Sequence, residues 1–302
     1  GVMVDRYNRK LMMMLSDFTA VLATALILIL HLSGNLQFWH LYIAAVLNGI
    51  GNTFQRPAYS AAVGTMVPKE QLGRVNGMMS LVEAGPGVVA PLLAGMLLPV
   101  IGLTGILTLD IVTFFLAIGA LLVIFVPQPQ RTEEGQKAQG NMLKEAAFGF
   151  RYIFARPSLL GLQMLFFAGN LFSGVAFTVM APMILARTNQ NALMFGTVQT
   201  AGAIGAVVGG IAMSAWGGFK RRIHGVLASW IWFGVFSACL VGTGFGLPVW
   251  VAGAALGELV IPLMNGSNQA IWQAKVAPDL QGRVFSSRRL IAWFTNPVSP
   301  II

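Results

Sequence analysis

Apolar stretches long enough to cross a lipid bilayer follow one another along almost the whole chain. A hydrocarbon core roughly 30 Å thick needs about 20 consecutive apolar residues in helical form, because lipid offers no hydrogen-bond partner to an open backbone. Windows bounded by Gly, Pro and charge predict eight complete spans and part of a ninth. These are residues 11–32, 39–66, 77–98, 104–126, 159–185, 194–216, 223–243, 249–271 and 290–302. The sequence therefore predicts an all-α membrane protein.

The composition supports the same class. Hydrophobic residues make up 56% of the chain and charged residues only 10%, and the mean hydropathy is +0.73, which is too apolar for a soluble domain. The formal net charge of +9 does not indicate a nucleic-acid-binding protein, because the basic residues are not gathered in one patch with interleaved aromatics. A single cysteine, Cys239, excludes a disulfide within the chain.

Basic residues predict the orientation of the spans. All but two of the 19 Lys and Arg residues fall in every second connection between spans, the exceptions being Arg56 and Arg187. Because basic loops stay on the cytoplasmic side of a membrane, residues 1–10 and 127–157 are predicted to lie inside the cell. The regular alternation independently supports the number of spans.

The longest polar stretch divides the chain into two halves. We interpret residues 127–158 as a cytoplasmic linker, within which residues 141–155 are expected to form an amphipathic helix on the membrane surface. The halves, 1–126 and 159–302, repeat in order. Gln71-Leu72-Gly73-Arg74-Val75 corresponds to Leu280-Gln281-Gly282-Arg283-Val284, and the same register places Pro91 on Pro300 and Gly1 on Gly210. An in-order repeat of this kind predicts two parallel helical bundles.

The first motif is the charged loop at the start of the chain, which contains Gly1, Asp5, Arg6, Arg9 and Lys10. It resembles the loop between the second and third helices of major facilitator superfamily transporters. The resemblance implies a gating role, in which this loop staples the second helix to the eleventh in one conformation. Asp5 would then lie near the positive N-terminal end of a helix that begins around Ser286 and Ser287. The alternative is that these residues only set the topology.

A second motif lies inside the predicted span 77–98. Gly85, Pro86 and Pro91 predict a kinked helix, because proline removes a backbone hydrogen bond and glycine allows close helix contact. The segment is similar to the antiporter motif on the fifth helix of facilitator-superfamily drug exporters. The match is partial, because Leu81 occupies the first glycine position. Small-residue packing is the alternative interpretation.

Charged side chains within predicted spans form a third group. A carboxylate at the centre of a membrane helix costs roughly 2.5 to 3.5 kcal/mol on insertion scales, so such groups usually face a cavity or a partner. Burial raises the pKa of a carboxyl group and so favours proton loading near neutral pH. The proton-coupling candidates are Glu258 and Glu83 first, then Asp17 and Asp110, with Arg56 as a counter-charge. Asp17 and Asp110 lie closer to span ends and are alternatively structural.

Three segments narrow the resemblance to one branch of the superfamily. Val4–Lys10, Phe54–Ala58 and Val67–Leu72 are most similar to macrolide-efflux and siderophore exporters. By this resemblance residues 1–126 contain family helices three to six and residues 159–302 contain helices seven to ten and part of eleven. The chain would then be a fragment lacking the first two helices and the last. One departure is Asn48, which stands before Gly49-Ile50-Gly51 where many antiporters carry an arginine.

Together these patterns predict a proton-coupled exporter of amphipathic small molecules, of drug, macrolide or siderophore type, that works by alternating access. Its partners would be the substrate, protons and the lipid bilayer, and we expect a multi-pass monomer in a bacterial plasma membrane. No enzymatic activity, cofactor, metal or nucleic acid is expected, because phosphate-binding, metal-binding and nucleophile motifs are not found. Candidate substrate-cavity residues are Asn48, Phe54, Phe172 and Met180. A non-transporting sensor or scaffold and a facilitator or lipid translocase remain as alternatives.

Overall fold

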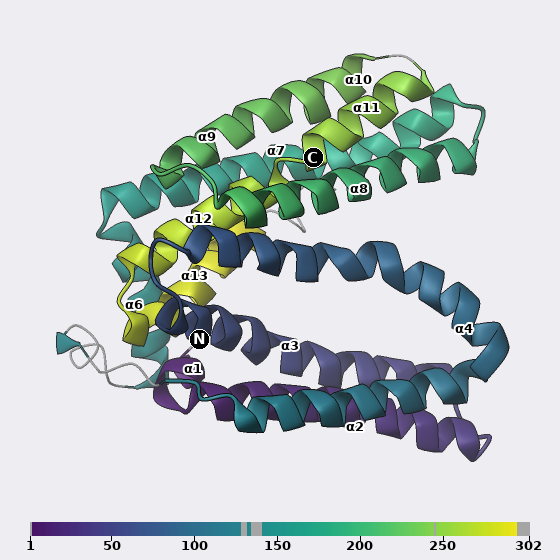
Figure 1. Ribbon diagram of the computed structural model, residues 1–302, viewed down its shortest axis with the longest axis vertical. Helices are drawn as coiled ribbons and strands as arrows, with labels where there is room; N and C mark the ends of the chain where they lie inside the picture. The colour runs from purple at the N-terminus through teal and green to yellow at the C-terminus, as the bar shows by residue number, and fades with distance from the viewer. Residues whose placement is uncertain (1, 128–131, 134–140, 245, 295–302) are drawn as a thin grey trace. The chain divides into compact units, whose positions relative to one another are not determined.

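The computed structural model describes residues 2–127, 132–133, 141–244 and 246–294, and this part of the chain contains helices and no strand (Figure 1). The first helices are α1 (Val2–Arg6), α2 (Arg9–Leu32), α3 (Phe38–Met66), α4 (Leu72–Val123), α6 (Met142–Phe154), α7 (Pro157–Arg187) and α8 (Ala192–Trp216). They are followed by α9 (Arg222–Phe233), the π-helix η1 (Gly234–Cys239), α10 (Leu240–Thr243), α11 (Leu247–Glu258), α12 (Ile261–Lys275), the 3-10 helix η2 (Pro278–Leu280) and α13 (Gln281–Trp293).

The chain forms two compact units, and each combines segments that are distant in sequence. Unit 1 contains Gly1–Met66, Pro91–Phe150 and Val276–Ser287. Unit 2 contains Val67–Ala90, Arg151–Lys275 and Arg288–Ile302. The division into halves at the linker 127–158 stays a prediction.

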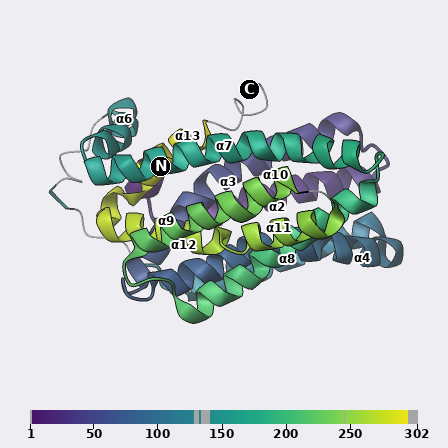
Figure 2. The same ribbon diagram turned by 90° about the horizontal axis from the view of Figure 1, so that it is seen from above.

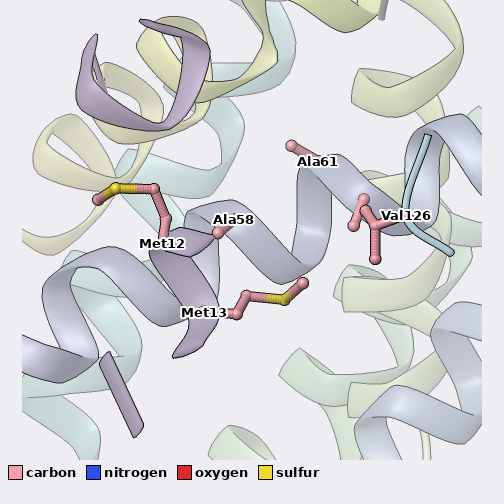
Figure 3. Close-up of a cluster of buried hydrophobic side chains, with 6 residues drawn as sticks. Met12, Met13, Ala58, Ala61 and Val126 are labelled. Carbon is pink, nitrogen blue, oxygen red and sulfur yellow. The ribbon is translucent and has the colours of Figure 1, made fainter. Parts of the chain in front are cut away.

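Unit 1 is built on the contact between α2 and α3. The Asn8 side chain caps α2 by accepting the backbone N–H groups of Lys10 and Leu11. Small residues then bring the two helices close together, and the Ser16 hydroxyl donates to the Gly51 carbonyl oxygen at 2.6 Å. A buried apolar cluster lies at the same contact and also includes the residue Val126 (Figure 3). Its members are Met12, Met13, Ala58, Ala61, Ala62 and Val126.

Unit 2 is organised around the contact between α8 and α11, which lie side by side (Figure 2). Glycines in α8 make this contact possible, because a Cβ on Gly205 or Gly209 would overlap a backbone carbonyl oxygen of α11 or of the residue that follows it. The close approach of α8 and α11 therefore depends on these two glycines. Buried apolar side chains from four helices fill the adjacent core. They are Ile184, Val198, Val241, Trp250 and Ala254.

The segment α4 consists of two helices that meet at a kink at Gly102, where φ is 63°, so the predicted spans 77–98 and 104–126 correspond to its two parts. The span 249–271 is instead divided into α11 and α12. Pro262 explains this division, because it has no N–H to donate to the carbonyl four residues earlier, that of Glu258.

Six helical segments of the described chain are long and apolar enough to cross a membrane. They are Arg9–Leu32, Leu93–Val123, Pro157–Arg187, Ala192–Trp216, Arg222–Thr243 and Leu247–Lys275. The predicted span 39–66 is helical, as α3, but is more polar. The helix α13 begins at Gln281, earlier than the predicted span 290–302, of which residues 295–302 lie outside the described residues.

Candidate functional site

Asp5 caps the N-terminus of α13 within unit 1. Its two carboxylate oxygens accept the backbone N–H groups of Gly282 and Arg283, each at 2.8 Å. The first N–H groups of a helix have no partner inside the helix and carry the positive end of its dipole, so a carboxylate is stabilised there. Asp5 therefore lies at a helix N-terminus as expected, although that helix begins at Gln281 rather than near Ser286.

Charged side chains extend this contact into a buried network. The Glu145 carboxylate of α6 has no exposed surface and lies 2.5 Å from Arg6 Nη2 and 3.2 Å from Arg283 Nη2. Arg283 Nε also lies 3.6 Å from Asp5 Oδ2. We call Asp5, Arg6, Glu145 and Arg283 the Asp5 cluster. In it, one carboxylate from the linker and one from the first loop both face Arg283.

The helix α6 packs directly against α13. A Cβ on Gly149 would overlap the Ser287 hydroxyl and would lie 2.5 Å from the Arg283 carbonyl oxygen. Ahead of α6, Thr132 donates its backbone N–H to Asp279 Oδ2 at 2.8 Å. The linker therefore contacts both ends of the short segment between Asp279 and Ser287.

The other basic residues of the first loop hold backbone carbonyl groups. Arg9 is buried and donates to the carbonyl oxygens of Ala61, at 2.7 Å, and of Pro278. Lys10 donates to the carbonyl oxygens of Leu122 and Ile124, at 2.8 and 3.1 Å. The carbonyl groups that Lys10 binds lie at the C-terminal end of α4, where a positive charge is favoured. Gly1 lies outside the described residues.

Burial changes the acid–base properties of the Asp5 cluster. It raises the pKa of Asp5 from an ordinary value of 3.8 to about 6, and this effect exceeds the lowering by the two backbone N–H groups, Arg283 and Arg9. The hydrogen bond with Glu145 raises the pKa of Arg6. Arg6 therefore stays positively charged, whereas Asp5 titrates close to the physiological range.

The repeat places a related contact in unit 2. Ser214 corresponds to Asp5 and Gly73 to Gly282 in the repeat register. A Cβ on Gly73 would overlap the Gly217 carbonyl oxygen and the Arg222 guanidinium group, and Arg222 donates to the carbonyl oxygens of Gly217 and Glu70. The same loop-to-helix contact therefore occurs in both units, but only the one in unit 1 has an aspartate at this position.

A second candidate site lies inside unit 2, where residues of α7, α8, η1, α10 and α11 line a cavity of about 220 Å³. Glu258 lines this cavity together with the polar side chains of Gln199 and Ser237. No hydrogen bond or ion pair to Glu258 is found among the described residues. The remaining lining residues are Phe177, Met180, Val198, Gly202, Ala203, Val241 and Ala254. We call this space the Glu258 cavity.

The other intramembrane charges have different surroundings. Gln55 donates to Asp17 at 2.5 Å and Thr24 donates to Asp110 at 2.6 Å, both from a neighbouring helix in unit 1. Glu83 and Arg56 are exposed in this structure. The contacts of Asp17 and Asp110 favour the structural alternative for these two residues, and their part in proton coupling stays a prediction.

The predicted substrate residues fall into two groups. Met180 lines the Glu258 cavity, and Phe172 and Met180 both line a neighbouring cavity between α7 and the α9–η1–α10 segment. Asn48 and Phe54 belong to α3 in unit 1, where Asn48 donates to the Ala44 carbonyl oxygen and Phe54 packs against the cluster of Figure 3.

The antiporter-like residues Gly85, Pro86 and Pro91 lie within α4, which continues as a helix through all three. The backbone of α4 leaves helical angles at Gly102. Their predicted role as a kink remains untested.

The sequence alone does not single out the side chains of Glu145, Gln199, Ser237 and Arg283. Glu145 was one of several charges in a polar linker, and no sequence signal showed that its side chain would be buried. Gln199 and Ser237 lie in apolar segments as isolated polar residues, which is a weak signal. The Gly-Arg-Val repeat draws attention to Arg283 in the sequence, but it does not predict the contact of Arg283 with Asp5.

Comparisons with known proteins agree with the helical architecture. The Major Facilitator Superfamily matches residues 1–300. Macrolide efflux protein A of Enterococcus faecalis is 27% identical over 304 residues, covering 99% of this chain and 92% of that protein. The Streptococcus pyogenes protein of the same name is also 27% identical, covering 100% of this chain and 74% of its own length.

A solved structure shows the same fold. The crystal structure of a bacterial homologue of the iron transporter ferroportin, in an outward-facing state, has a TM-score of 0.72 at 16% identity, covering 99% of this chain and 76% of that one. At this identity the similarity concerns the fold alone. With the family match over residues 1–300, the chain belongs to the Major Facilitator Superfamily of membrane transporters.

Proposed function

We propose that this transporter exports amphipathic small molecules in exchange for protons, with the carboxyl group of Glu258 as the proton carrier. The proposal of efflux is supported by similarity to macrolide efflux proteins of two bacteria. Substrate would be exposed alternately to the two sides of a bacterial plasma membrane.

The surroundings of Glu258 carry the proposal of proton coupling. Glu258 lies in the membrane-spanning segment Leu247–Lys275 and lines a cavity between helices. No hydrogen bond or ion pair to its carboxyl group is found among the described residues. An ionised carboxylate is costly in such a place, so a proton or another cation is needed to neutralise it. By contrast, Asp17 and Asp110 already accept hydrogen bonds from neighbouring helices.

The Asp5 cluster would control the conformational cycle. Its contacts tie the first loop and the linker helix α6 to the start of α13. A cluster that exists in one conformation and opens in another biases the equilibrium between them without touching the substrate. We therefore assign gating to this cluster and coupling to Glu258.

Gradient-driven transport in proteoliposomes tests the proposal. An imposed proton gradient should drive accumulation of a labelled macrolide against its concentration gradient, and collapse of the gradient by a protonophore should stop it. Accumulation that survives the protonophore would contradict proton coupling. Absence of any macrolide movement in protein that still binds the macrolide would favour the sensor or scaffold alternative.

A further inference from the structure

The connection between α8 and α9 carries basic side chains that no other described residue contacts. We call residues 216–224 the basic loop. Lys220, Arg221 and His224 are exposed, and no hydrogen bond or ion pair to their side chains is found within the described part of the chain. In the related loop of unit 1, by contrast, Arg6 binds a buried carboxylate. The basic side chains of this loop in unit 2 are therefore available to a partner outside the chain.

A second loop of unit 2 lies beside the basic loop and adds to its positive charge. Arg222 donates to the Glu70 carbonyl oxygen at 3.2 Å, which joins the two loops, and Arg74 is also exposed. Residues 67–74 and 217–224 together contain five Lys or Arg residues and one acidic residue, Glu70. The two loops thus form a surface with an excess of positive charge.

The helices that the basic loop joins fix its depth in the membrane. The segment that ends at Trp216 and the segment that begins at Arg222 are both long and apolar enough to cross a membrane, so the residues between them lie at a membrane surface. Trp216 is exposed, and an indole ring favours the headgroup layer. Since basic loops stay on the cytoplasmic side, we expect this loop at the headgroups of the inner leaflet.

An exposed apolar stripe continues from the basic loop along α9. It consists of Ile223, Leu227 and Ile231, which are all exposed and recur at every fourth position, so they lie on one side of the helix. His224 lies on the same side, because it is three positions before Leu227. Basic groups and an apolar stripe are therefore in line along one helix, and a phospholipid needs both kinds of contact.

This arrangement selects among the possible anionic partners. A free phosphate ion or a nucleic acid uses basic groups that face water and has no use for an adjoining apolar stripe within a membrane-crossing segment. A phospholipid has an anionic headgroup and acyl chains that match both parts. Each Lys or Arg near an anionic membrane surface raises the affinity about fivefold, so two neighbouring residues are enough for a clear preference.

We propose that the basic loop binds the phosphate group of an anionic phospholipid of the inner leaflet through Lys220 and Arg221, with an acyl chain of the same lipid along the apolar stripe of α9. The inference goes beyond the proposed function, because it involves neither Glu258 nor the substrate. The bound lipid ties the connection between α8 and α9 to the membrane surface and stabilises the folded protein by mass action.

Native mass spectrometry of the protein released from detergent resolves single bound lipids and tests the inference. From an equal mixture of phosphatidylglycerol and phosphatidylcholine of the same chain length, the protein should retain phosphatidylglycerol. The double variant Lys220→Gln, Arg221→Gln should bind the first phosphatidylglycerol about 30-fold more weakly, because two charges are lost. Its affinity for phosphatidylcholine should not change.

Arg187→Gln is the matched control. It removes an exposed charge of unit 2 that is separated from the basic loop by the whole length of α8, so this variant should bind phosphatidylglycerol like the native protein. Equal retention of the two lipids by the native protein would overturn the inference. Unchanged phosphatidylglycerol binding in the double variant, or an equal loss in Arg187→Gln, would also overturn it.

A photoreactive phosphatidylglycerol tests the place of the acyl chain. With a diazirine in its acyl chain, it should crosslink to the peptide that contains Ile223, Leu227 and Ile231, and this crosslink should weaken in the double variant. Glycerol 1-phosphate, which has the phosphate group but no acyl chain, should not compete. Crosslinks confined to other helices would contradict the lipid site, and competition by glycerol 1-phosphate would assign the loop to a soluble anion instead.

Discussion

Asp5 and Arg283 meet both through the backbone and through their side chains. The Arg283 backbone N–H donates to Asp5 Oδ2 at 2.8 Å, and the Arg283 Nε lies 3.6 Å from the same oxygen. The residues are 278 positions apart in the chain. This contact links the first loop to the start of α13 and is the centre of the proposed gate.

Replacement of Asp5 by Asn should open this contact. The Asn side chain keeps one acceptor oxygen but turns its NH₂ group toward one of the two backbone N–H groups. The donor-to-donor contact should cost about 1 to 3 kcal/mol. This corresponds to a change of about five- to 150-fold in the ratio of two forms of the protein, the docked form, in which Asp5 contacts α13, and the released form, in which it does not. Spin labels at Asn8 and Ser286 should report a larger released population by pulsed electron resonance.

The effect of Asp5→Asn on function should match a gate. Transport should fall, while substrate affinity in protein trapped in its binding-competent conformation should stay the same, because Asp5 biases an equilibrium and does not line the cavity. Glu133→Gln, which removes an exposed carboxylate from the linker, is the matched control. Lower affinity in the trapped variant would instead place Asp5 in the substrate site.

The raised pKa of Asp5 predicts the direction of a pH effect. With a pKa of about 6 when docked and 3.8 as the ordinary value, the docked form holds the proton more tightly. Docking therefore takes up a proton between about pH 4 and 6, and the docked form loses stability as the pH rises through that window. A protonated carboxyl group still has an acceptor lone pair on each oxygen, so it keeps both backbone contacts.

The same pair of spin labels measures this effect. The released population should grow from pH 4.5 to pH 6.5 and should then stay constant, and Asp5→Asn should show no such change. A released population that shrinks over this interval, or an equal response in the variant, would show that another group titrates.

Glu145 should contribute to stability through both arginines. Removing one partner from a buried ion pair costs about 3 kcal/mol or more, so Glu145→Gln should lower the thermal midpoint in detergent by about 5 to 10 °C. Lys144→Gln changes the charge of the adjacent exposed residue and should have little effect. In a double-mutant cycle, Arg6→Gln should cost much less in the Glu145→Gln background than alone. Strict additivity would mean that the Arg6–Glu145 contact is energetically irrelevant.

The alternation of basic loops predicts which side of the membrane each loop faces. In a Cys239→Ser background, cysteines at Asn8 and Gln136 should react with an impermeant reagent only after the membrane is opened. Labelling of both from outside intact cells would invert the predicted topology.

Much of the helical architecture follows from the long apolar runs of the sequence, because membrane spans need long, uncharged segments. The division of one predicted span at Pro262 also has a sequence cause, since a proline leaves one carbonyl of the helix unbonded. Gly102, with φ of 63°, separates the two helical parts of α4, close to the break between the predicted spans 77–98 and 104–126.

The sites were less predictable than the spans. The family resemblance placed Asp5 at the N-terminus of a helix near Ser286, and the structure places it at the N-terminus of α13, which begins at Gln281. The burial of Glu145 depends on Gly149 allowing α6 to approach α13, and the sequence of a polar linker contains no sign of that contact. Similarly, Ser237 reaches the Glu258 cavity through a π-helical turn, which residue periodicity does not reveal.

Proton-driven export through Glu258 is tested most directly by gradient-driven transport in vesicles that contain the Glu258→Gln or the Glu83→Gln variant. Because Gln mimics the protonated acid, we expect Glu258→Gln to abolish export driven by a pH gradient while expression is preserved. We expect Glu83→Gln, which changes an exposed residue, to retain export. Unchanged gradient-driven export by both variants would contradict the carboxylate assignment.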